Sequence, residues 1–165
     1  MFNLHHSSGL DARGFLFGPL LAQRLGVGFV LVRKKGKLPG PTTSVSYTLE
    51  YGKAEVEIQE DAIEASQKVL LIDDLLATGG TLYAACELMK KLKAEVLGCL
   101  VVIELTDLKG AERIKPNPVF SLATSMIKAS FFSATKTLRR ILAISSSRDI
   151  INRRSSCCGF RVMAA

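Results

Sequence analysis

The stretch that decides the fold is VLLIDDLLATGGT, residues Val69–Thr81. Its first four residues are apolar, too few for a helix, and they predict a parallel strand buried on both faces. Asp73 and Asp74 follow at the carboxyl end of this strand, where open α/β sheets place their ligands. Gly79 and Gly80 then remove Cβ atoms, so that backbone N–H groups can approach an anion closely.

Hydroxyl and carboxylate groups complete this loop as a candidate phosphate site. Thr78 and Thr81 add hydroxyl donors, and a helix expected to begin near Thr81 directs its positive end at the same place. The carboxylates of Asp73 and Asp74 suit a ribose diol, or water on a bound Mg²⁺. The alternative is an ordinary glycine-rich turn, with both aspartates serving only as helix-start residues. The length and specificity of the motif favour a ribose 5-phosphate site.

Strand and helix patterns alternate on both sides of this stretch and predict an α/β fold. Helical spacing, β-branched runs and turn residues mark the elements. They are a helix at 16–25, a strand at 27–32, a loop at 33–43, a hairpin at 44–49 and 54–58, a helix at 81–92 and a strand at 96–103. The predicted architecture is a mostly parallel, Rossmann-like sheet flanked by helices, with an inserted flexible hairpin.

The 69–81 motif closely resembles the phosphoribosyl-diphosphate signature of the type I phosphoribosyltransferases. Four further segments resemble the adenine phosphoribosyltransferases of that family, in the right order along the chain. Residues 9–18 resemble the pyrophosphate-binding turn, 31–40 the basic segment, 46–52 the flexible catalytic flap, and 103–105 the strand end beside the base. The resemblance covers residues 9–122, which we expect to form the phosphoribosyltransferase core.

This resemblance implies a purine-salvage enzyme. It would transfer 5-phosphoribosyl from phosphoribosyl diphosphate to adenine, giving AMP and pyrophosphate, with Mg²⁺ as cofactor and a homodimer as the assembly. The positions implied to bind phosphoribosyl diphosphate or AMP are Asp11, Arg13, Arg33, Lys37, Asp73, Asp74, Ala77, Thr78, Gly79, Gly80 and Thr81. Arg13, Glu50 and Tyr51 are implied to be catalytic, and Leu105 to lie against adenine. No direct protein ligand is expected for Mg²⁺, which substrate and water would hold near Asp73 and Asp74.

Several matched positions also suit these roles by their chemistry. Arg13 lies in a turn before a helix, where its forked guanidinium could clamp a pyrophosphate rather than face solvent. Glu50 and Tyr51 lie in a glycine-containing hairpin, which fits a lid that closes over substrate, although a plain surface hairpin has the same pattern. Lys34, within the basic run after the second strand, fits a solvated surface equally well.

The net charge of +7 invites a nucleic-acid interpretation, which the distribution of charge disfavours. Residues 1–123 hold 14 basic and 14 acidic residues, whereas 124–165 hold 8 basic residues and one acid. The four cysteines have no zinc-ligand spacing and are expected to be free thiols. No signal sequence or membrane span is evident, so we expect a soluble, cytoplasmic protein.

Both ends depart from the family pattern. Residues 1–8 are expected to be an extension unrelated to the family, so that the strand before the pyrophosphate turn and the hood over adenine are missing. Residues 123–165 are expected to be a basic Ser/Arg-rich tail, disordered or loosely helical. Two alternatives follow: an impaired fragment that only binds ligand or pairs with full-length subunits, and a phosphoribosyl-diphosphate-sensing regulator that binds nucleic acid. The neutral body disfavours the regulator.

Overall fold

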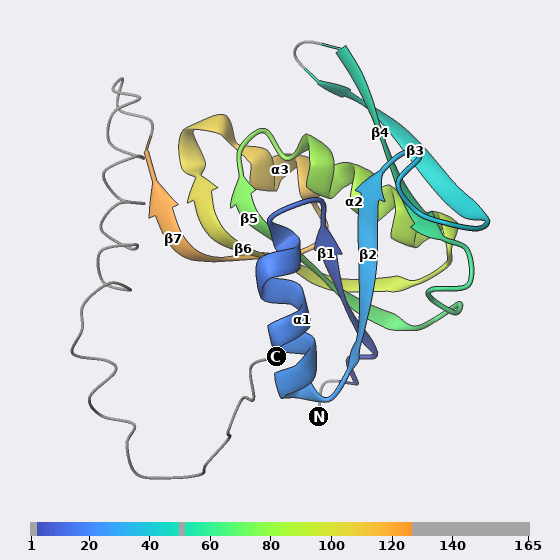
Figure 1. The fold of residues 1–165 in the computed structure, drawn as a ribbon. Coiled ribbons are helices and arrows are strands. Elements are labelled where there is room, and N and C mark those ends of the chain that lie inside the picture. Colours follow the sequence, from blue (N-terminus) through green and yellow to red (C-terminus); the bar gives the residue numbers. More distant parts are fainter. Residues whose placement is uncertain (1–2, 50–51, 127–165) are drawn as a thin grey trace, which may run out of the picture. The chain divides into compact units, whose positions relative to one another are not determined.

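A computed structural model describes residues 3–49 and 52–126, and these form a seven-stranded sheet with helices on both faces (Figure 1). The strand order is β3-β4-β2-β1-β5-β6-β7. The strands are β1 (His6–Leu10), β2 (Gly28–Lys34), β3 (Thr42–Leu49), β4 (Gly52–Gln59), β5 (Lys68–Leu76), β6 (Glu95–Leu105) and β7 (Val119–Ser125). The helices are α1 (Gly14–Leu25), α2 (Gly80–Lys91), the 3-10 turn η1 (Thr106–Leu108) and α3 (Gly110–Ile114).

The prediction of a mostly parallel sheet with an inserted hairpin is confirmed. Strands β2, β1, β5, β6 and β7 run parallel to one another, while β4 pairs antiparallel with β2 and β3. The hairpin β3–β4 extends beyond the rest of the sheet (Figure 1). β5 runs to Leu76, further than its apolar start indicated, because its pairing with β6 continues through Asp73 and on to Leu76.

The expectation that the N-terminal strand is missing is wrong. β1 lies in the centre of the sheet, where it pairs in parallel with both β2 and β5. Only Leu10, its last residue, is large and apolar, and the four residues before it show no apolar pattern. Ser7 and Ser8 are buried, and the Ser7 hydroxyl donates to the carbonyl oxygen of Gly18 at 3.0 Å. Backbone hydrogen bonds to two neighbouring strands hold this segment, together with the fully buried Leu10 side chain.

Helix α1 packs on the sheet through its small residues and not through its leucines. Gly14, Gly18 and Ala22 are its buried positions, and a Cβ on Gly14 would lie 2.4 Å from the Ile72 carbonyl oxygen. Leu16 and Leu20 are both 64% exposed, so the regular leucine spacing that predicted the helix marks largely its outer side. Glycine thus permits a close approach of α1 to β5.

The main hydrophobic core lies between the sheet and α2. Ala85, Leu88 and Met89 of α2 are buried against β5 and β6 side chains that include Leu71 and Val101. This packing fixes the start of α2 relative to the end of β5. Residues 127–165, most of the predicted tail, lie outside the described residues, as do Glu50 and Tyr51 at the tip of the hairpin.

Candidate functional site

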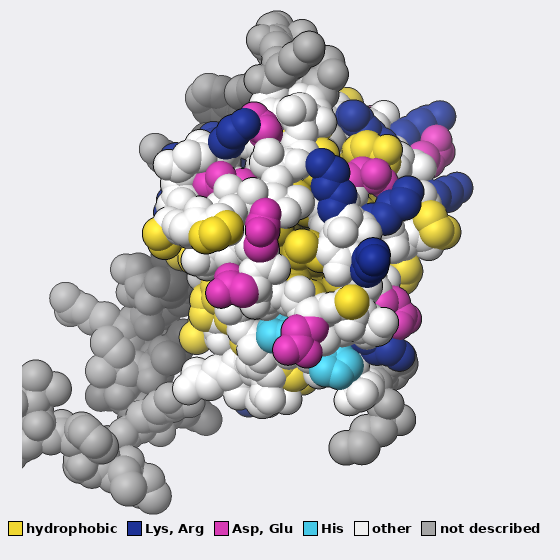
Figure 2. Space-filling view, turned by 90° about the vertical axis from the view of Figure 1, so that its right-hand side faces the viewer, with side chains coloured by type: hydrophobic (Ala, Val, Ile, Leu, Met, Phe, Trp, Pro, Cys, Tyr) yellow, Lys and Arg dark blue, Asp and Glu magenta, His cyan; other side chains and the backbone are white. Residues whose placement is uncertain are grey.

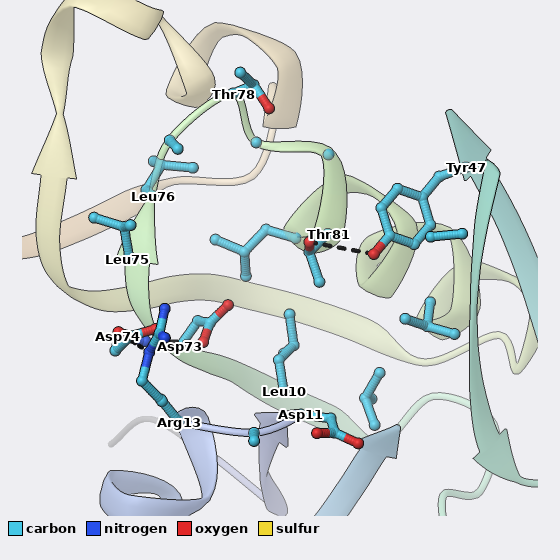
Figure 3. Close-up of a pocket in the computed structure, with 18 of the residues that line it drawn as sticks. Leu10, Asp11, Arg13, Tyr47, Asp73, Asp74, Leu75, Leu76, Thr78 and Thr81 are labelled. Carbon is cyan, nitrogen blue, oxygen red and sulfur yellow. Dashed lines mark hydrogen bonds and ion pairs between the residues drawn. The ribbon is translucent and has the colours of Figure 1, made fainter. Parts of the chain in front are cut away.

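The carboxyl ends of the parallel strands surround a cavity of about 620 Å³ (Figure 3). The turn after β1 contributes one side, the hairpin a second, and the connection from β5 to α2 a third. The predicted positions that line it are Asp11, Arg13, Asp73, Asp74, Ala77, Thr78, Gly79, Gly80 and Thr81. The structure therefore brings together residues that are up to about seventy positions apart in the sequence.

The connection between β5 and α2 has the geometry of a phosphate cradle. Gly79 adopts φ +77° directly before α2, and a Cβ there would lie 2.5 Å from the carbonyl oxygen of Gly110. No side chain caps α2, so the N–H groups of its first turn are available to an anion. Thr81 belongs to that turn, and its hydroxyl lies 3.4 Å from the hydroxyl of Tyr47 (Figure 3).

Two carboxylates and one guanidinium lie on the opposite side of the cavity. Arg13 forms an ion pair with Asp74 through its Nε atom (Figure 3). The Asp74 backbone N–H donates to Asp73 Oδ1 at 2.9 Å. Burial raises the pKa of Asp73 to about 7, and the neighbouring charge of Asp74 also raises it, against the opposing effect of the Asp74 N–H and Arg13. A cation or a pair of hydroxyl donors would favour the ionised form of this carboxyl.

Arg33 and Lys37 do not line the cavity and reach it indirectly, through Asp11. Arg33 Nε lies 3.3 Å and Lys37 Nζ 3.8 Å from Asp11 Oδ2, whose side chain is only 8% exposed. Leu105, the last residue of β6, is not among the cavity-lining residues. Its predicted contact with adenine stays a prediction. Glu50 and Tyr51 lie outside the described residues, so their predicted catalytic roles also stay predictions.

Lys34, which the sequence left open between a site residue and a solvated surface, lines the cavity, and so does Tyr47, which the sequence did not single out. Both fall inside segments with a family resemblance, 31–40 and 46–52. Tyr47 also follows the alternation of the hairpin, which places every second side chain on the face toward α2. The period of the strand is therefore the signal that could have identified it.

The structure describes residues 3–49 and 52–126. Within that part of the chain, no group of three or more His, Cys, Asp or Glu side chains could hold a metal ion. None of the helices described there is long and apolar enough to cross a bilayer. Asp73 and Asp74 nevertheless suit an outer-sphere role, because Mg²⁺ retains several waters and takes few protein ligands when substrate phosphates are present.

Taken together, the cavity offers an anion cradle, a pair of carboxylates and a basic group, at the carboxyl edge of a parallel sheet. In an α/β protein, this combination has the chemistry that suits a sugar phosphate. Residues 8–133 match the phosphoribosyl transferase domain, and the chain belongs to that family.

Relatives within the family are adenine phosphoribosyltransferases. That of Mus musculus is 65% identical over 119 residues, which are 72% of this chain and 66% of the relative. The chain thus spans about two thirds of the length of the curated relatives that it matches. The enzyme of Saccharomyces cerevisiae, solved with an imino-altritol bisphosphate and adenine, superposes with TM-score 0.70 at 50% identity, covering 72% of this chain and 67% of that one. The Trypanosoma brucei enzyme, solved with AMP, pyrophosphate and ribose-5-phosphate, gives TM-score 0.69 at 28% identity, covering 81% and 68%.

Proposed function

We propose that this chain transfers a 5-phosphoribosyl group from phosphoribosyl diphosphate to adenine, releasing AMP and pyrophosphate. The observation that carries the proposal is the single cavity in which the cradle, Asp73 with Asp74, and Arg13 converge. Each group suits one part of the substrate. The relatives named above, two of them solved with adenine or AMP, support the choice of adenine among the possible acceptors.

The 5′-phosphate would lie in the cradle formed by residues 77–81. Backbone N–H groups at the start of α2 and the hydroxyls of Thr78 and Thr81 would donate to its oxygens. The Tyr47 hydroxyl, which contacts Thr81, links this cradle to the hairpin above it. Through this contact, phosphate bound at the cradle would draw the hairpin over the site, as substrates close lids in other enzymes.

The ribose hydroxyls would be held by Asp73 and Asp74, and the diphosphate by Arg13 with Arg33 and Lys37 behind Asp11. These groups would stabilise the negative charge that develops on the departing pyrophosphate as the ribosyl carbon becomes cationic. Mg²⁺, the proposed cofactor, would supply further charge neutralisation there when bound. Glu50 and Tyr51 are proposed to close the site, and Leu105 to contact the base.

A homodimer is the assembly that we propose. Several large apolar side chains of α1 are exposed in the described part of the chain, namely Leu16, Phe17, Leu20 and Leu25. Surfaces of this kind commonly take part in protein contacts. Sedimentation analysis of the purified chain would measure the assembly directly, and a monomer at micromolar concentration would contradict this part of the proposal.

The test of the activity is formation of AMP from adenine, phosphoribosyl diphosphate and Mg²⁺ by the purified chain, with the full-length mouse relative as positive control. AMP formation should depend on phosphoribosyl diphosphate. The variant Asp73→Asn/Asp74→Asn should lose it by at least about a hundredfold, because both carboxylates that hold the ribose are removed. Failure of the unmodified chain to form AMP under conditions in which it binds phosphoribosyl diphosphate would contradict the proposed activity.

A further inference from the structure

One buried carboxylate, that of Glu57 on β4, holds the basic segment between β2 and β3. Glu57 is 3% exposed, and both oxygens of its carboxylate accept hydrogen bonds. Its Oε1 accepts the backbone N–H of Lys37 at 2.8 Å and that of Leu38 at 2.9 Å. Its Oε2 accepts the hydroxyl of Thr42 at 3.2 Å. A buried carboxylate is tolerated only when such donors surround it.

The donors around Glu57 keep it charged. Burial raises its pKa, but the backbone N–H groups of Leu38, Gly36 and Lys37 and the Thr42 hydroxyl outweigh that effect, and the pKa lies below its usual value. Successive N–H groups that converge on one anion form a nest. Here the nest belongs to the loop and the anion belongs to β4, so the carboxylate sets the conformation of the loop.

Lys37 is held from both sides of its backbone. Arg33 lies directly opposite Glu57 in the β2–β4 pairing. Its Nη1 atom donates to the carbonyl oxygen of Lys37 at 3.2 Å, while Glu57 accepts from the N–H of the same residue. With the backbone fixed, the Lys37 ammonium stays 3.8 Å from Asp11, which lines the cavity.

We infer that Glu57 is a positioning residue for the pyrophosphate end of the site. It does not line the cavity and acts through the loop, by holding residues 36–38 so that Lys37 and Arg33 face Asp11. The inference depends on the proposed function only for the identity of the anion that this basic group would bind. Sequence alone gave no sign of it, because Glu57 occupies one of several alternating polar positions on the hairpin.

Glu55, two residues earlier on β4, is a matched control. Its carboxylate bonds the side chains of Lys35 and Ser44, at 2.9 and 2.7 Å, and reaches no backbone N–H of the loop in any of the hydrogen bonds described. Glu55→Gln and Glu57→Gln therefore remove one charge each from neighbouring positions of the same strand. Only Glu57→Gln places an amide N–H₂ among the loop donors.

The experiment is calorimetric titration of the full chain with Mg²⁺-pyrophosphate and, separately, with AMP. Glu57→Gln should lower the affinity for pyrophosphate at least about tenfold, because a charge-assisted contact is lost. Its affinity for AMP should stay within about twofold of the wild-type value. The affinity of Glu55→Gln for each ligand should stay within about twofold of the wild-type value. Lys37→Ala should match Glu57→Gln, and the double variant should bind no more weakly than Lys37→Ala, since the two residues act through one path. Unchanged pyrophosphate affinity in Glu57→Gln would overturn the inference.

A readout without ligand separates this inference from the proposed function. Trypsin should cleave after Lys37 at least about tenfold faster in Glu57→Gln than in the wild type or in Glu55→Gln, because the loop is released. A wild-type chain that binds neither ligand but shows this pattern would refute the proposed function alone. Equal cleavage in all three would overturn the positioning role. Should Glu57→Gln not fold, Thr42→Val removes one donor to the same carboxylate. This variant should lower the affinity for pyrophosphate about threefold, and an unchanged affinity would contradict the inference.

Discussion

Asp73 is a largely buried carboxyl that lies beside a second carboxyl, and its environment opposes ionisation. Its pKa is raised to about 7, whereas an unfolded chain holds this group near 3.8. The folded state therefore binds a proton that the unfolded state releases between these values. The stability that this proton contributes is fully present below about pH 3.8 and is lost as the pH rises through about 7. A raised pKa of this kind is typical of a poorly solvated carboxyl group in a site that accepts a cation or hydroxyl donors.

Asp73→Asn should therefore change the stability of the protein in a pH-dependent way. Asparagine keeps the acceptor for the Asp74 N–H and never ionises, so the variant should be more stable than the wild type at pH 8, by on the order of 2 kcal/mol. At pH 4 the difference in free energy of unfolding should be far smaller, because the unfolded wild type also takes up a proton there. Urea denaturation of both proteins at the two pH values measures the difference. A variant that is equally or less stable at pH 8 would show that Asp73 is not strained by its charge.

Among the elements, the connection from β5 to α2 was the one predicted best from sequence. Few structures other than this connection accommodate an apolar strand, two acids and two glycines followed by a helix. The strand, the acids, the glycines and the helix all lie where the sequence predicted them. β1 was missed because Ser7 and Ser8 give no apolar signal, and its stability comes from pairing with strands distant in sequence. The outer position of the α1 leucines could not be predicted either, since their spacing predicts a helix but not which side of it faces the sheet.

Within the site, contributions from the connecting loops were harder to predict than those from the central motif. Asp11 and Arg13 were expected at the cavity and lie there. Arg33 and Lys37 were expected to approach the diphosphate, and the structure places them behind Asp11. Their position depends on Glu57, whose role requires tertiary contacts that no local pattern encodes. The roles of all these residues in binding stay predictions.

Gly79 provides a prediction for the cradle as an element. Gly79→Ala should destabilise the protein by more than about 2 kcal/mol, because it combines a positive φ with a Cβ 2.5 Å from Gly110. Gly26→Ala is the control: its φ is +67°, but no atom lies within 4 Å of a Cβ there, so only the backbone cost of about 1 kcal/mol applies. Thermal or urea denaturation compares the two variants. Equal losses would show that the contact with Gly110 does not constrain the loop.

On the scale of the whole molecule, charge is distributed unevenly along the chain. Residues 1–123 are balanced, and Figure 2, viewed from the side of the β3–β4 hairpin, shows basic side chains with acidic ones among them. The excess of positive charge belongs to residues 124–165. If the function resides in the cavity, ligand binding should depend on the charges that line it or lie directly behind it, and not on those of residues 124–165.

The most direct measurement of that claim is the thermal stability of the chain with millimolar phosphoribosyl diphosphate and Mg²⁺. Ligand that binds the native state alone must raise the melting temperature. The wild type should show this rise, and Asp73→Asn/Asp74→Asn should lose it. Arg148→Ala/Arg153→Ala removes two charges outside the described residues and should leave it unchanged. No rise for a folded wild type, or an equal loss in both double variants, would contradict the assignment of the cavity as the phosphoribosyl site.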